Sequence, residues 1–365
     1  MTDSKSRLLS DPSGVGVRNG QFMGLECAAS EARVVMFPIP WDVTTSYRPG
    51  TVNGPESILN ASYQLDLYSP YMDEIWKMPL HTLEMDLSWL TKSQKLRAKS
   101  EKYIEFLEEG GDVSTSPEMQ QILKEANAGC RDLHQWSESV AREQLRAGKW
   151  VLSFGGDHSV SLGPIRAAAD HFDGVSVLHF DAHADLREAY EGFEDSHASI
   201  MFNVLKHPKV SKLVQVGIRD VSAIETKMIK ADPRIETYFD WDVQTRKLSG
   251  ESWKSICQEI VSHLGPKVYI SFDIDGLDPK LCPNTGTPVP GGLELFETTM
   301  LIQEVVKSGR QVVGADLVEV APGQEGDEWD GNVGARALFQ LAVAMTQSLK
   351  LAKSESPIPT SGGRV

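Results

Sequence analysis

The stretch HFDAHADL, residues 179 to 186, places two aspartates and two histidines within eight positions. It follows an apolar run typical of a buried strand. Because alternate side chains of a strand share a face, Asp181, His183 and, if the strand continues, Asp185 project together. Unpaired buried carboxylates are costly, and a divalent cation between them would remove that cost. A solvated loop after a strand is the alternative, and this stretch alone does not decide between the two.

Two more clusters of the same kind occur in the chain. FGGDHSVSLG follows the strand pattern at 149–154 and contains His158, whereas SFDIDGLDP ends the pattern at 267–274 and contains Asp273 and Asp275. In parallel sheets the carboxyl ends of the strands lie at one edge, and ligands bind there. The three clusters are therefore predicted to meet.

Taken singly, each of these motifs is ambiguous. The glycines of GGDHS suggest a phosphate loop, but the spacing and the lysine of a P-loop are missing. DIDGLD faintly resembles a calcium-binding EF-hand loop, yet position five is Leu277 and position twelve is Asn284, where a bidentate glutamate is required. A lone D-x-D pair is more often part of the surface than of a metal site.

Taken together, the clusters predict a pair of metal ions. Their two imidazoles and four carboxylates are too many for one cation but suit two divalent ions that share bridging aspartates. Mixed nitrogen and oxygen ligands without thiolate favour Mn, Ni, Co, Fe or Zn over Mg or Ca. Two such ions about 3.5–4 Å apart turn a shared water into a hydroxide near neutral pH, which implies hydrolysis. The candidate ligands are His158, Asp181, His183, Asp185, Asp273 and Asp275.

The elements that would position these residues alternate between short β-branched runs and amphipathic stretches, which predicts an α/β fold with a mainly parallel sheet and helices on both faces, in three layers. The predicted strands are 33–39, 149–154, 175–180, 212–217, 267–274 and 311–318. The predicted helices are 118–147, 159–171, 197–206, 221–231, 252–264, 295–308 and 333–350.

Residues 91–147 break this alternation, because two long polar helical patterns meet there at GGDVSTSP without an intervening strand. They form a lid, a subunit contact or a simple cover for one face of the sheet. The predicted organisation is an N-terminal extension at 1–30, a single catalytic domain at 31–350 with a helical insertion near 91–128, and a disordered tail at 351–365.

Composition narrows the classes of partner. The net charge of −15 in 365 residues argues against nucleic acid and anionic membranes and is compatible with a cationic substrate. No apolar run is long enough to span a membrane and the start of the chain lacks a signal-peptide pattern, so we expect a soluble cytoplasmic protein. The four cysteines are far apart without a C-x-x-C pair, which predicts ordinary reduced residues.

The motifs GGDHS, DAHAD and SFDIDGLDPKLCPNTGTPVPGG resemble, in order and spacing, the three signatures of the ureohydrolase family, which includes arginase and agmatinase. YRPGTVNGPESIL, residues 47–59, also resembles the N-terminal segment of that family, and the likeness covers roughly residues 30 to 350 apart from the stretch around 91–128. The resemblance implies an arginase/deacetylase-like fold and hydrolysis of a guanidino compound to urea and an amine. It also implies three pairs of ligands, one for each ion and one bridging, namely His158 with Asp185, His183 with Asp275, and Asp181 with Asp273.

The resemblance assigns further roles. Asp185 would also orient the hydroxide, and His197 in GFEDSHASIM matches a histidine that carries protons to the leaving amine. Glu319 in GADLVEVAPG matches the glutamate that binds the guanidinium, and Thr285 in PNTGTP matches a hydroxyl near that pocket. His179 is expected to be a buried, hydrogen-bonded histidine and not another ligand.

The substrate is less clearly indicated than the family. The polar segment with which arginase holds an α-carboxylate is absent after DAH, so the chain resembles agmatinase-like members. Trp329, in GQEGDEWDGNVGARALF, could close over a cation. This residue and the helical insertion resemble members that hydrolyse free guanidine and use Ni²⁺ in place of the usual Mn²⁺. Free guanidine is therefore the first hypothesis, with agmatine or a small guanidino acid as alternatives.

The resemblance also implies a homotrimer or homohexamer, and leaves open an accessory protein that loads the metal. A metal-dependent binding or regulatory relative without catalysis is the alternative of another class. The presence of all six ligands together with His197 and Glu319 argues against it.

Overall fold

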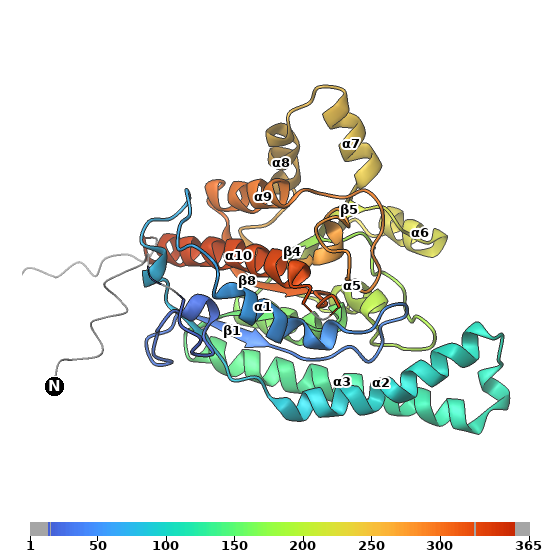
Figure 1. Cartoon of the computed structure of the whole chain (residues 1–365). Helices are drawn as coiled ribbons and strands as arrows, with labels where there is room; N and C mark the ends of the chain where they lie inside the picture. Colours follow the sequence, from blue (N-terminus) through green and yellow to red (C-terminus); the bar gives the residue numbers. More distant parts are fainter. Residues whose placement is uncertain (1–13, 15, 325, 355–365) are drawn as a thin grey trace, which may run out of the picture.

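The computed structural model describes residue 14 and residues 16–324 and 326–354, and it is built around one sheet of eight parallel strands. The strand order is β2-β1-β3-β8-β7-β4-β5-β6. This arrangement confirms the predicted α/β fold with a parallel sheet (Figure 1). The strands are β1 Val34–Pro38, β2 Leu80–Thr82, β3 Trp150–Phe154, β4 Val175–Phe180, β5 Val210–Ile218, β6 Ile235–Phe239, β7 Lys267–Asp273 and β8 Gln311–Val318.

The six strands predicted from sequence are all present, and the two that the prediction missed, β2 and β6, are the edge strands. β2 has only three residues, too few for a periodic pattern. β6, IETYF, is only partly buried and so lacks the apolar run that marks an inner parallel strand. The central strands β3, β4, β7 and β8 are buried almost throughout, because helices cover both faces of the sheet.

The helices form one layer on each face of the sheet. α10 packs on β8 together with α1 and α9, whereas α3 packs on α4 and β3 on the opposite face (Figure 1). Two helices that the prediction missed, α1 and α7, have nine residues each. The helices are α1 Gly54–Ser62, α2 Leu87–Glu108, α3 Pro117–Arg146, α4 Leu162–His171, α5 Ile200–Leu205, α6 Ala223–Ala231, α7 Asp240–Leu248, α8 Trp253–Ser262, α9 Leu295–Lys307 and α10 Trp329–Ser354.

The structure agrees to different degrees with the predicted N-terminal extension, helical insertion and C-terminal tail. Residues Phe22 and Met23 of the extension are buried, and their backbone N–H groups donate to Thr82 Oγ1 and Ser62 Oγ. The insertion is a hairpin of two helices, α2 and α3, as its two polar patterns predict. Helix α10 continues to Ser354, so residues 351–354 of the predicted tail are helical, and the rest of that tail, 355–365, lies outside the described residues.

Two features of the structure bear on the expectations from composition. The four cysteines are unpaired, and three of them are buried. Among the described residues, the longer helices are too polar to lie across a lipid bilayer.

Candidate metal centre and active site

Four neighbouring strands of the sheet deliver the candidate residues. β3, β8, β7 and β4 lie side by side and in register, with Phe154 beside Leu317, and Phe272 beside both Leu317 and Phe180. Each strand ends within a few residues of these positions. The chemical groups of four sequence-distant motifs therefore meet at one edge of the sheet, as the strand-end argument predicts.

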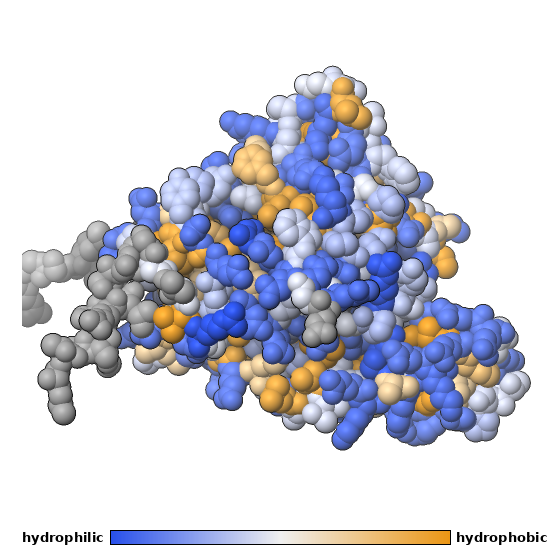
Figure 2. All heavy atoms as spheres, viewed as in Figure 1, coloured by the Kyte–Doolittle hydropathy of each residue, from blue (hydrophilic) through white to orange (hydrophobic). Residues whose placement is uncertain are grey.

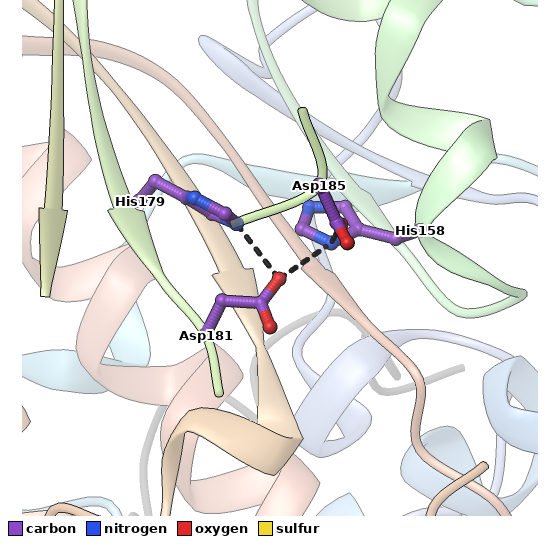
Figure 3. A group of neighbouring side chains, drawn as sticks. All are labelled: His158, His179, Asp181 and Asp185. Atoms are coloured by element: carbon purple, nitrogen blue, oxygen red, sulfur yellow. Dashed lines mark hydrogen bonds and ion pairs between the residues drawn. The ribbon is translucent and has the colours of Figure 1, made fainter. Parts of the chain in front are cut away.

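The first cluster is centred on His158, which follows β3 in a short 3-10 turn. Its Nδ1 lies 3.1 Å from Asp181 Oδ2, 3.1 Å from Asp185 Oδ2 and 3.2 Å from Asp273 Oδ2. Figure 3 shows His158 and Asp185 facing Asp181 across a small gap. Nδ1 makes no hydrogen bond of good geometry although it is buried, which is what a nitrogen aimed at an ion requires.

The second cluster adjoins the first and shares one residue with it. His183 Nδ1 lies 3.1 Å from Asp275 Oδ2 and 3.4 Å from Asp181 Oδ1. The two oxygens of Asp181 therefore face different histidines. The ligand atoms of Asp181, His183 and Asp275 lie within 4.8 Å of one another, and so do those of His158, His179, Asp181 and Asp185. Two clusters with a common carboxylate suit two ions that share a ligand.

His179 is buried and hydrogen bonded, as expected. Its Nε2 lies 2.8 Å from Asp181 Oδ2 (Figure 3). Its Nδ1 lies 3.0 Å from Gln215 Nε2. Both ring nitrogens therefore have partners within the protein. This arrangement orients the Asp181 carboxylate, in the way that outer hydrogen bonds orient metal ligands.

The electrostatics of the cluster call for positive charge. Burial raises the pKa of Asp185 to about 7, and burial together with Asp275 raises the pKa of Asp273 well above its ordinary value. Burial would lower the pKa of His158 and His183, but the neighbouring aspartates outweigh it and raise both. In the absence of a cation, the closely spaced carboxylates therefore favour protonation of Asp185, Asp273 and the two histidines. Divalent cations would replace those protons, so the residues fit a metal pair.

Two polar side chains that are not candidate ligands, Ser271 and Asp316, hold the ring of His158 in place. His158 Nε2 lies 2.9 Å from Ser271 Oγ, and that hydroxyl donates to Asp316 Oδ1 at 2.9 Å. Both residues are fully buried, on β7 and β8. The contact fixes the ring of His158 with Nδ1 turned toward the aspartates.

Glu319 follows β8 with a left-handed backbone, φ 61°, which is uncommon for a residue other than glycine. Its backbone N–H donates to Gly156 O, and Thr285 Oγ1 donates to its backbone oxygen at 2.8 Å. In the side chain, Oε1 accepts from the backbone N–H of His158, whereas Oε2 is buried without a partner. Burial and Asp157 raise the pKa of this carboxyl well above its ordinary value.

His197 is buried at the start of a 3-10 turn. Its Nδ1 lies 3.3 Å from Ser196 Oγ and 3.5 Å from Thr44 Oγ1, and its Nε2 lies 3.5 Å from Ser46 Oγ. Burial, with His183 nearby, lowers the pKa of His197 to about 3. The ring is therefore neutral near pH 7.

A cavity of about 150 Å³ opens beside the second cluster. His183 reaches it with 24% of its side chain exposed. Trp329 lies outside the residues that line this cavity: it is about half exposed, and its indole N–H donates to Lys280 O at 3.0 Å. The lining consists of Ser46, His183, Asp185, Arg187, Tyr190, His197, Ala198, Asp220, Glu225 and Thr287.

Several of these residues were missed from sequence. Thr44 and Ser46 come from the loop after β1, and Thr287, whose Oγ1 donates to Asp275 Oδ2 at 3.3 Å, comes from the loop after β7. The run of three hydroxyls at 44–46, just beyond a predicted strand, was the available signal.

A parallel α/β sheet carries two adjoining histidine–aspartate clusters at its carboxyl edge, and this set of nitrogen and oxygen donors fits divalent ions. The family model described as the arginase family matches residues 32–345, and the chain belongs to that family. It is 33% identical over 292 residues to the N(1)-aminopropylagmatine ureohydrolase of Thermus thermophilus, covering 80% of this chain and 84% of that protein. It is 32% identical over 297 residues to the agmatinase of Bacillus anthracis, with the same coverage.

Structural comparison agrees with this assignment. The agmatine ureohydrolase of Thermoplasma volcanium superposes with a TM-score of 0.66 at 25% identity, covering 92% of this chain and 96% of that one. The expected resemblance to agmatinase-like ureohydrolases is confirmed, and with it the class of enzyme, a hydrolase of amidino carbon–nitrogen bonds.

Proposed function

We propose that the protein hydrolyses a small guanidino compound to urea with the help of two divalent metal ions. The observation that carries this proposal is the pair of buried clusters that share Asp181 and adjoin a small cavity. His158 and Asp185 would hold one ion, His183 and Asp275 the other, and Asp181 and Asp273 both. When bound, the ions would lower the pKa of a water molecule and polarise it for attack on the guanidinium carbon.

Glu319 is proposed to bind the guanidinium of the substrate. Its buried Oε2 has no partner, and a planar cation beside it would satisfy both the hydrogen bond and the charge. Thr285 supports this role through its hydrogen bond to the Glu319 backbone oxygen, which holds the left-handed turn in place. Trp329, proposed from sequence as a substrate contact, lies outside the cavity lining, and its indole N–H donates to Lys280 O in the loop that leads to Thr285.

His197 is proposed to pass a proton to the departing amine. His197→Ala is expected to lower kcat about 100-fold, as for loss of a general acid–base group, because alanine has no side-chain group that can take up and pass on a proton. Metal content should stay at the wild-type value, since His197 lies outside both ligand clusters. Steady-state urea release and elemental analysis of the same preparation measure both quantities. Unchanged turnover in this variant contradicts the role.

Free guanidine is the first-choice substrate, because the cavity of about 150 Å³ is smaller than the roughly 300–1,000 Å³ of pockets for larger organic ligands. Agmatine is the second candidate. The relatives named agmatinase and N(1)-aminopropylagmatine ureohydrolase favour it, since their substrates carry a guanidinium on an aliphatic amine chain. Mn²⁺ and Ni²⁺ are both proposed cofactors, and assembly as a homotrimer or homohexamer is proposed from the family.

The substrate is tested by measuring kcat/KM for urea release from guanidine, agmatine, 4-guanidinobutyrate and arginine, with protein loaded separately with Mn²⁺ and Ni²⁺. We expect guanidine to lead by about tenfold or more, equivalent to about 1.4 kcal/mol, because an alkyl chain must leave the small cavity. A lead for agmatine by the same margin makes agmatine the substrate and rejects guanidine.

A further inference from the structure

The helical hairpin formed by α2 and α3 lies against the protein at one end and projects from it at the other (Figure 1). The projecting end is largely hydrophilic (Figure 2), with exposed Glu108, Glu109, Asp112 and Glu118. None of the described residues that line the active-site cavity belongs to the hairpin. The hairpin therefore contributes no side chain to the lining of this cavity.

The inner part of α3 holds the segment that leads to His197. Asn127 is buried, and its amide group makes two hydrogen bonds with this segment. Nδ2 donates to Gly192 O at 3.2 Å, and Oδ1 accepts from the Glu194 backbone N–H at 3.1 Å. A buried amide used in this way fixes the backbone three residues before His197.

Helix α2 adds contacts to the same segment. Tyr103 Oη donates to Glu191 O at 2.9 Å, and the ring of Tyr103 packs on Phe193 with centroids 5.3 Å apart. Gly192, between these two residues, has φ 83° and sits against Leu123 of α3. Both helices thus contact residues 191–194, the segment that leads to His197.

The hairpin also holds the second support of His197, the loop after β1. Arg97 of α2 is buried, and its guanidinium donates to the backbone oxygen of Thr45. Ser93, one turn earlier, bonds to Asp42 through both its hydroxyl oxygen and its proton. The hydroxyls on either side of Thr45, those of Thr44 and Ser46, are the ones that face the two nitrogens of His197.

One hairpin therefore anchors both segments that set the position of the His197 ring. We propose that Asn127 and Arg97 are positioning residues for His197, so that the hairpin acts on the proton-transfer step and not as a lid. This inference rests on the proposed role of His197 and deepens it. Neither side chain needs to touch substrate or metal for the effect, because a small displacement of a catalytic group is enough to slow a reaction.

A double-mutant cycle tests the inference. Asn127→Ala is expected to lower kcat about tenfold with KM within about twofold and with unchanged metal content. In the His197→Ala background the same change should cost less than about twofold, because the group it positions is gone. Gln121→Ala is the matched control, because Gln121 is an exposed amide on the same helix and its Nε2 donates to Glu125 Oε1. It should leave kcat unchanged. Arg97→Lys should retain more activity than Arg97→Ala, since lysine keeps a charged donor.

Equal loss of kcat in both backgrounds, or no loss in either, overturns the inference. Asn127→Asp, which keeps the size and the acceptor but not the donor to Gly192, serves if the alanine variant does not fold. Amide hydrogen exchange of residues 190–198 gives a second measure that needs no turnover, and Asn127→Ala should raise it by about tenfold at unchanged metal content. Unchanged exchange overturns the inference whatever the activity. Absence of urea release from the wild type, with exchange raised as expected, refutes the proposed function alone.

Discussion

Asp181→Asn is expected to remove the metal pair and with it more than about 10³-fold of the urea-releasing activity. Asp181 is the residue common to both clusters: Oδ2 faces His158 and Oδ1 faces His183. Asparagine keeps the shape of the side chain but offers one neutral oxygen in place of two charged ones. Both proposed sites lose a charged ligand through a single substitution.

The measurement for Asp181→Asn is the number of bound ions per chain, by elemental analysis after dialysis, together with kcat. Asp173→Asn is a matched control, because Asp173 is exposed and its side chain pairs with Lys209, which belongs to neither cluster. Its left-handed φ of 55° is one that asparagine also adopts. The variant Asp181→Asn retaining two ions per chain and full activity would reject Asp181 as a shared ligand.

Glu319→Gln is expected to lower kcat/KM by roughly 10³-fold while both ions stay bound. Glutamine can still accept the hydrogen bond from the His158 backbone N–H, so the local fold is preserved. It cannot supply the negative charge that a buried guanidinium needs, and loss of one partner of a buried charge pair costs about 2–5 kcal/mol. The effect should therefore appear in substrate use and not in metal content.

Urea release at a series of substrate concentrations, with metal content and thermal unfolding measured in parallel, tests the Glu319→Gln prediction. Glu328→Gln, an exposed neighbour in sequence, is its control. If Glu319→Gln instead loses metal while its kcat/KM per bound ion pair stays normal, Glu319 serves the metal site and another group binds the guanidinium.

The six candidate ligands could be predicted from sequence because their positions depend only on where the strands end and on which edge of the sheet those ends share. Each stands at or just beyond the end of a buried strand with a strong apolar pattern, and parallel strands end at one edge. The distances from His158 to Asp181 and to Asp273 follow because β3, β8, β7 and β4 lie side by side and end in register. The edge strands β2 and β6 escaped prediction because short or half-exposed strands carry little periodic signal.

The surroundings of the site depend on contacts that no local pattern encodes. Thr44 meets His197 across 153 positions of sequence, and Asn127 meets Gly192 across 65. His197 itself was assigned from family resemblance, since one histidine at a helix start carries no chemical signature. The function of residues 91–147 was left open for the same reason, because a polar helical pattern does not show what its buried side contacts.

The central claim, a hydrolase that needs two ions per chain, is tested most directly by one titration. Metal-free protein is supplied with increasing Mn²⁺ or, separately, Ni²⁺, and urea release from guanidine and agmatine is recorded against the number of ions bound per chain. The account predicts that activity rises with the second bound ion and reaches a plateau at two. Two bound ions without urea from these substrates, 4-guanidinobutyrate or arginine would contradict it and favour a metal-dependent binding protein.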